Sequence, residues 1–150
     1  MHRDNTKVKF RLANESDSQI LFDWVNEKEV RRNSLNIQLV QWGNHVSWFN
    51  SKLESNKCKI FVLEIEDVPV GQIRIDKEDE YWLIDYSIDK NHRGNGYGYL
   101  IIDLLIKNIG SIKLKGVVKT SNVASQKVFE KLEFKANRNK DLIQFIYSLK

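Results

Sequence analysis

Arg93-Gly94-Asn95-Gly96-Tyr97-Gly98 is the stretch that decides the fold. A strand-like run over 81–88 precedes it, and an apolar run at helical spacing over 100–106 follows it. Three glycines at alternate positions let the backbone approach a ligand closely, because they carry no Cβ atom. The first N–H groups of the following helix lack internal partners, and the helix dipole adds partial positive charge there. The stretch therefore predicts a phosphate or pyrophosphate site at the start of a helix.

Two other kinds of glycine loop fit this stretch less well. A dinucleotide fingerprint needs Gly-x-Gly-x-x-Gly, but position 99 is Tyr and position 101 is Ile. A nucleoside-triphosphate loop ends in Gly-Lys-Ser/Thr, which does not occur here. A mobile glycine turn is a simpler interpretation, which is weakened by the cation of Arg93 at the entrance and by the apolar helix that follows.

The pattern Arg93-x-x-Gly96-x-Gly98 resembles the acyl-CoA loop of the GNAT acetyltransferase superfamily. A second segment resembles another motif of that family: it runs from Asn122 through Ser125 and Phe129 to Phe134. The resemblance extends from about Lys7 to the C-terminus. It implies an acetyl-CoA-dependent N-acetyltransferase with an α/β (α+β) fold. In the GNAT fold a mixed, mostly antiparallel central sheet has helices on both faces and contains a splayed pair of parallel strands.

Length and composition set limits that agree with this interpretation. The 150 residues predict one domain over 1–150, with 41% hydrophobic and 29% charged residues. The net charge of +4 is scattered, which argues against a nucleic-acid partner, although it favours a polyanionic small molecule such as CoA. No apolar stretch approaches the roughly 20 residues of a membrane span. The single cysteine, Cys58, excludes an internal disulfide and predicts a cytoplasmic protein.

Hydrophobic spacing predicts the order of elements. The predicted strands are 8–12, 59–66, 70–76, 81–88, 112–118, 134–136 and 142–149. The predicted helices are a first one through 20–25 after a capping box of Ser16 and Gln19, then 42–53, 98–109 and 122–132. The polar, basic segment 30–34 predicts a loop or a broken turn. The strand over 81–88 is apolar on both faces, which indicates a central position in the sheet.

Carried onto this chain, the resemblance implies a set of contacts to acetyl-CoA and no metal. The backbone of Tyr86, Ser87 and Ile88 would hold the pantetheine arm and donate to the thioester carbonyl. The pyrophosphate would lie on the loop residues Arg93, Gly94, Asn95, Gly96, Tyr97 and Gly98. On the helix over 122–132, Asn122 would contact the arm, and Ser125 and Phe129 would also face the cofactor.

Two features leave the proton-transfer groups open. Members of the family often have a tyrosine as thiolate acid where this chain has Phe129, and a glycine where it has Glu133. Some members place a glutamate early in the central strand, where this chain has Trp82. Asp85 on that strand is the candidate base if burial raises its pKa, or else a structural acid beside a cation. Glu66, Asp76 and His45 are weaker candidates.

The segment 30–53 predicts the acceptor wall, with Arg31, Asn33, His45 and Trp48 as candidate binding residues. Arg31 is expected to bind a diphosphate, which an arginine can hold with two parallel hydrogen bonds. An Arg, a small polar run and His-x-x-Trp-Phe resemble the amino-sugar N-acetyltransferases of pseudaminic-acid pathways, which implies a nucleotide-linked amino sugar as the partner. An acetyltransferase of ribosomal-protein N-terminal amines and a non-catalytic acyl-CoA-binding module are the alternatives. A lone His on a helix is more often structural than functional. The sequence allows a monomer or a homodimer.

Overall fold

The structure is a computed structural model that describes residues 5–110 and 112–148. Its strands are β1 (Val8–Leu12), β2 (Cys58–Ile65), β3 (Val68–Glu78), β4 (Tyr81–Ile88), β5 (Lys113–Lys119), β6 (Lys135–Arg138) and β7 (Leu142–Ser148). Its helices are α1 (Ser18–Val25), α2 (Lys28–Asn33), α3 (Trp42–Glu54), α4 (Tyr97–Ile109) and α5 (Val123–Lys131). Two short 3-10 turns, η1 (Glu15–Asp17) and η2 (Lys90–His92), precede α1 and the glycine loop.

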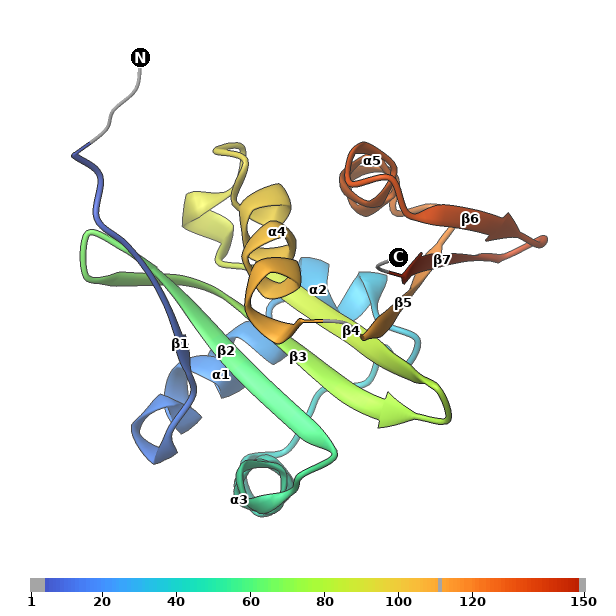
Figure 1. Ribbon diagram of the computed structural model, residues 1–150. Helices are drawn as coiled ribbons and strands as arrows, with labels where there is room; N and C mark the ends of the chain where they lie inside the picture. Colours follow the sequence, from blue (N-terminus) through green and yellow to red (C-terminus); the bar gives the residue numbers. More distant parts are fainter. Residues whose placement is uncertain (1–4, 111, 149–150) are drawn as a thin grey trace.

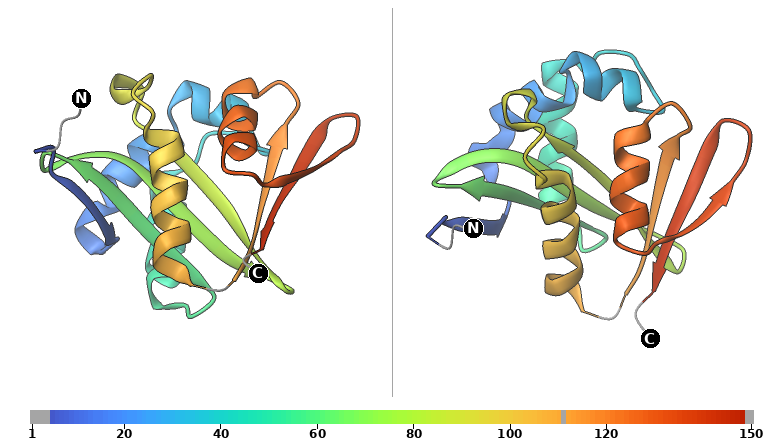
Figure 2. Two further views of the ribbon diagram at one scale, coloured as in Figure 1. Left: turned by 45° about the horizontal axis from the view of Figure 1, so that its top comes forward. Right: turned by 90° about the horizontal axis from the view of Figure 1, so that it is seen from above.

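The seven strands form one sheet in the order β1-β2-β3-β4-β5-β7-β6, in which only β4 and β5 run parallel. Helices α4 and α5 lie on one face of the sheet, and α1, α2 and α3 lie on the other (Figures 1 and 2). This arrangement confirms the predicted fold class, including the central position of the strand over 81–88.

The parallel pair β4/β5 separates halfway along its length. Pairing runs from Tyr81 opposite Lys113 to Ile84 opposite Gly116 and then stops. Residues 85–88 remain paired to β3 on their other side. Figure 1 shows β5 diverging from β4 beyond this point. One backbone edge of β4 is therefore left free for an extended chain.

The larger core lies between the sheet and helices α4 and α5, and Phe129 is one of its buried aromatic residues. The ring of Phe129 stacks on Phe145, with ring centroids 5.0 Å apart and planes inclined by 14°. It meets Phe134 edge-on at 4.9 Å. It also covers Gly116 on β5, where an added Cβ atom would lie 2.6 Å from Phe129 Cζ. The close approach of α5 to β5 therefore depends on a glycine at position 116.

Gly116→Ala is expected to destabilise the fold by about 1–3 kcal/mol, because the fully enclosed Phe129 ring cannot yield to the new methyl group. Chemical denaturation measures this loss. Gly43→Ala is the matched control, since no atom lies within 4 Å of that Cβ position in α3. It should stabilise the chain by up to about 1 kcal/mol. Equal effects of the two substitutions would contradict the packing argument.

Two predicted features of the N-terminal third are wrong. Segment 30–34 is not a loop, because α2 forms over Lys28–Asn33 with the Glu27 carboxylate accepting from the Glu29 N–H at 2.9 Å. The capping box belongs to Asn14 and Asp17 instead of Ser16 and Gln19. The predicted final strand agrees with β7, except that Leu149 lies outside the described residues.

Candidate active site

A pocket of about 360 Å³ lies between the sheet and helices α1 and α3. Trp24 of α1 and His45 and Trp48 of α3 contribute to its wall. Arg74 of β3 and Asp85 and Ser87 of β4 contribute to its floor. The structure thus brings four predicted site residues together in one cavity: His45, Trp48, Asp85 and Ser87.

Strand β4 separates this pocket from the region near α5. The side chains of Asp85 and Ser87 line the pocket, whereas that of Tyr86 lies on the opposite face. There the Tyr86 hydroxyl and the Ser125 hydroxyl of α5 share a hydrogen bond of 2.8 Å. Burial raises the pKa of Tyr86, with Ser125 opposing and Asp85 adding to the shift, so this phenol is protonated at neutral pH. Successive residues of β4 therefore serve two faces of the sheet: Asp85 and Ser87 face the pocket, and Tyr86 faces α5.

His45 is a buried part of the pocket wall. Its Nε2 lies 3.0 Å from the Ser18 carbonyl oxygen, which can only accept, so Nε2 carries the proton. The ring stacks on Phe49, with centroids 5.8 Å apart. Burial lowers the pKa of His45, and the bond to Ser18 only partly opposes this. His45 is therefore a neutral group at physiological pH, oriented by α1.

Asp85 and Arg74 lie opposite each other on the floor, in register on the paired strands. The Arg74 Nη1 and Asp85 Oδ2 atoms are 3.6 Å apart, and the Asp85 side chain is 53% exposed. Beside them, the Gln72 side-chain amide donates to the Ser87 hydroxyl at 3.2 Å. Asp85 is thus a carboxylate that incoming molecules can reach within the pocket.

The glycine loop opens α4 as the sequence predicted. Gly96 has φ +80° and forms the N-terminal cap of the helix. No atom lies within 4 Å of a Cβ position at either Gly94 or Gly96, so space is open above both. The first α-helical bond runs from the Leu100 N–H to the Gly96 carbonyl at 3.1 Å. The preceding N–H groups of α4 therefore have no partner within the helix, as a phosphate site requires.

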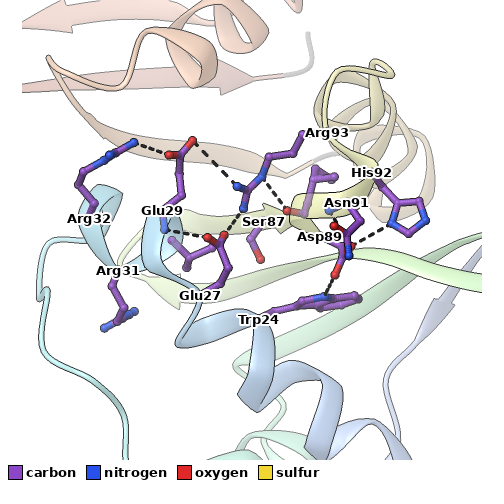
Figure 3. Close-up of polar contacts among 12 residues, drawn as sticks. Trp24, Glu27, Glu29, Arg31, Arg32, Ser87, Asp89, Asn91, His92 and Arg93 are labelled. Carbon is purple, nitrogen blue, oxygen red and sulfur yellow. Dashed lines mark hydrogen bonds and ion pairs between the residues drawn. The ribbon is translucent and has the colours of Figure 1, made fainter.

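Arg93, the cation at the loop entrance, is held in place by other groups of the protein. Its guanidinium is ion-paired with Glu27, and its Nε donates to the Ile88 carbonyl at 3.1 Å (Figure 3). Burial opposes the ionised form of Glu27, but the Glu29 N–H and Arg93 outweigh it and hold its pKa below the usual value. Arg93 therefore ties the end of β4 to the α1–α2 junction.

A second contact, between Trp24 and Asp89, joins α1 to the end of β4. The indole N–H of Trp24 donates to Asp89 Oδ1 at 2.9 Å, and His92 Nδ1 lies 3.0 Å from Asp89 Oδ2 (Figure 3). Trp24 belongs to the pocket wall, and Asp89 precedes the glycine loop. Trp24, Glu27 and Asp89 could not be predicted from the sequence, because the contacts that join them to the site cross more than 60 residues of chain.

Helix α5 carries the second predicted motif. The Asn122 side chain caps this helix by accepting from the Ser125 N–H at 3.3 Å. Phe129 is only 2% exposed, enclosed by Gly116, Phe134 and Phe145. The expectation that Phe129 faces the cofactor therefore needs correction, because its ring belongs to the core.

Arg31 and Asn33 do not line the pocket. Arg31 donates four hydrogen bonds: to the carbonyls of Val25, Asn36 and Gln38 and to the Ser34 hydroxyl. In Figure 3 its side chain points away from Arg93. Asn33 is the last residue of α2. The expected diphosphate grip by Arg31 is therefore corrected to a structural role, in which the guanidinium holds the segment between α2 and α3.

Within 5–110 and 112–148, no group of three or more His, Cys, Asp or Glu side chains is placed to hold a metal ion. No helix in these ranges is long and apolar enough to cross a membrane. Burial, followed by the nearby Asp76 carboxylate, raises the pKa of Cys58 to about 12, so this thiol is not a nucleophile at neutral pH.

The fold is shared with solved acetyltransferase structures. Spermidine N-acetyltransferase from Vibrio cholerae, in complex with CoA and spermine, superposes with a TM-score of 0.83 at 14% identity, covering 94% of this chain and 95% of that one. YncA, a putative acetyltransferase from Salmonella typhimurium with acetyl-CoA, gives 0.80 at 18% identity, covering 96% and 95%.

Sequence comparison adds a relative and a family. An uncharacterized protein of Methanocaldococcus jannaschii, MJ1062, is 24% identical over 97% of this chain, which spans 32% of that protein's length. Residues 19–134 match the model of the acetyltransferase (GNAT) family. That match covers the sheet from β2 to β5, both motifs and the pocket wall. The chain therefore belongs to the GNAT acetyltransferase family.

Proposed function

We propose that this chain transfers the acetyl group of acetyl-CoA to the amine of a small molecule, and that this molecule is a nucleotide-linked amino sugar. The observation that carries the proposal is the division of β4 between two sites. Its free edge and the glycine loop lie at one site, and Asp85 and Ser87 open into the pocket at the other.

The residues present fit acetyl-CoA. The open positions above Gly94 and Gly96 and the free N–H groups of α4 suit a pyrophosphate, which needs several donors and close approach. The unpaired edge of β4 over 86–88 suits an extended amide-bearing arm. Ser125 of α5 lies beside it at Tyr86, and Asn122 caps the same helix. When bound there, acetyl-CoA supplies an activated acetyl group.

The chain's own groups would then manage the protons. An amine must lose a proton to attack, and the Asp85 carboxylate is the accessible acceptor on the pocket side of β4. The Tyr86 hydroxyl, bonded to Ser125, is a protonated phenol on the other side. It is the group we assign to the proton-donor position left vacant by Phe129.

The pocket wall supports a sugar as the acceptor. Trp48 is 37% exposed and offers an apolar ring face, on which sugar rings stack, while the buried Trp24 adds apolar surface behind it. Asn44, Gln72 and Ser87 line the same cavity and can hydrogen-bond to hydroxyl groups. The spermine seen with the Vibrio cholerae enzyme shows that a related fold accepts a small amine. A cytoplasmic location, where acetyl-CoA is made, remains a prediction.

The test is release of CoA thiol in the presence of acetyl-CoA and one amine at a time, with the product identified by mass. We expect turnover with a UDP-linked amino sugar. Turnover only with peptide N-termini would replace the acceptor with a protein amine. Tight acetyl-CoA binding without turnover on any amine would favour a non-catalytic module instead.

Trp48→Ala is expected to raise the acceptor KM about 2–10-fold, the value of one aromatic stacking contact, with little change in the acetyl-CoA KM. Trp42→Ala is the control, because Trp42 lies on the same helix outside the pocket lining. An equal effect of both substitutions on the acceptor KM would show that Trp48 acts only through the packing of α3.

A further inference from the structure

The pocket floor contains the cation Arg74, which is ion-paired to Asp76 and, at the longer distance of 3.6 Å, to Asp85. Arg74 Nε donates to Asp76 Oδ2 at 2.7 Å, which fixes the base of the guanidinium. The group stacks over Trp48, with Cζ 4.9 Å from the ring centroid. Neither terminal nitrogen makes a hydrogen bond within the described part of the chain, since the 3.6 Å approach to Asp85 is too long for one. Arg74 is thus held rigidly and presents unused donors to the cavity that it lines.

The charges around Arg74 are balanced in pairs. Asp76 is shared by Arg74 and by Lys52 of α3, whose Nζ lies 2.8 Å from Asp76 Oδ1. Asp85 provides the second carboxylate, and the neutral His45 adds no charge. Lys52, Arg74, Asp76 and Asp85 therefore sum to zero. A polycation entering this pocket would meet Arg74 with no surplus of carboxylates to offset the repulsion.

An acceptor with both an amine and an anion would preserve this balance. Its amine can lie at Asp85, and an oxyanion can accept two parallel hydrogen bonds from the guanidinium, the geometry for which arginine is suited. Stacking on Trp48 keeps the guanidinium plane in place without consuming these donors. The arrangement therefore matches a molecule in which an oxyanion lies a few bonds from the reacting amine.

We propose that Arg74 is the specificity-determining residue of the acceptor pocket and selects amines that carry a phosphate or carboxylate. This inference rests on the proposed acetyltransferase function and deepens it. The sequence predicted that Arg31 would bind the anion. The inference assigns that role to Arg74 of β3 instead. It also predicts that polyamines are poor acceptors for this chain, although its fold resembles that of an enzyme solved with spermine.

The experiment measures CoA release with acceptors that differ only in the anion. Glucosamine is compared with glucosamine 1-phosphate, and serinamide with serine, which distinguishes a phosphate from a carboxylate. Spermidine is the polycation arm. For the wild type we expect kcat/KM at least about tenfold higher for the anionic member of one pair, a difference that one charge-assisted contact provides.

The variants then locate the effect. Arg74→Gln should reduce that ratio towards one by raising the KM of the anionic acceptor, and Arg74→Lys should retain part of it. Arg138→Gln, a substitution of an exposed arginine on β6, should leave both acceptors unaffected. Calorimetry with UDP, which has no amine to acetylate, gives a readout without turnover: binding should weaken at least about tenfold in Arg74→Gln only. Unfolding temperatures identify any variant that fails to fold. If Arg74→Gln does not fold, the anion preference of Arg74→Lys is used to test the role of Arg74.

The outcomes separate the two proposals. Turnover with equal preference for neutral and anionic amines, or with a preference for spermidine, would overturn the role of Arg74 while leaving the acetyltransferase intact. An anion preference that survives Arg74→Gln would overturn it as well. No thiol release with any amine would contradict the proposed function itself, and with it this inference.

Discussion

Replacing Gly96 with asparagine is expected to raise the dissociation constant of acetyl-CoA at least about a hundredfold, because two or more charge-assisted bonds to the pyrophosphate would be lost. Gly96 has φ +80° and ψ +13°, a left-handed conformation that asparagine adopts more readily than other residues with side chains. The fold should therefore survive, and the new side chain would fill the open space above the loop. Calorimetry with acetyl-CoA measures the loss.

The matched control lies at the other end of the same helix. Gly110 also has a positive φ, +76°, with no atom within 4 Å of its Cβ position. Gly110→Asn should lower the melting temperature at least as much, because its ψ of −148° suits a side chain less well. It should leave the affinity for acetyl-CoA unchanged. If both variants bind acetyl-CoA like the wild type, the glycine loop is not the pyrophosphate site.

Asp85→Asn is expected to lower kcat about a hundredfold or more, within the range that general bases contribute. Asparagine has nearly the same shape and remains polar, but it cannot accept a proton from an amine at neutral pH. The affinity for acetyl-CoA should change little, since the Asp85 side chain opens into the pocket and not towards the free edge of β4. Steady-state kinetics at saturating acetyl-CoA give kcat, and calorimetry gives the affinity.

Glu80→Gln is the control for charge. Glu80 lies in the turn that joins β3 to β4 and pairs with Lys113 at 2.7 Å on the surface. Its removal should cost little stability and no activity. A loss in kcat of less than about threefold for Asp85→Asn would show that the amine loses its proton to water or to another group.

The sequence was sufficient for the architecture because the two motifs lie on the elements that frame the gap between β4 and β5. The order of strands and helices followed from hydrophobic spacing. Helix α2 was missed because Val30 is its single apolar residue and Glu27 is an unusual cap. The capping box was misplaced by two residues because both positions have the right spacing. The box forms at Asn14 and Asp17 because Arg11 fixes the Asp17 carboxylate with two hydrogen bonds of 2.8 Å.

The site was less predictable because its decisive contacts cross the sheet. Arg31 lies near the acceptor wall in sequence, but its donors bind backbone carbonyls of α1 and of the segment that follows α2. Arg74 could have been found from its pattern: Gln72, Arg74 and Asp76 alternate with buried Ile73 and Ile75. Polar side chains at alternate positions of a central strand indicate a site on that face. Nothing in the sequence indicates that Phe129 packs on Gly116, since only the fold brings the two together.

The paired ties from Trp24 to Asp89 and from Glu27 to Arg93 affect how this protein could be engineered. A library that varies Trp24 or Glu27 to admit new amines would also loosen the turn before the glycine loop, so gains in acceptor range would be offset by weaker acetyl-CoA binding. The segment between α2 and α3 has no such link. Arg31 and Asn26 hold its backbone, while the side chains of Leu35, Ile37 and Leu39 are 63–67% exposed. Diversity introduced at those three positions would vary the exposed segment that leads to Val40 in the pocket lining, and leave the cofactor site unchanged.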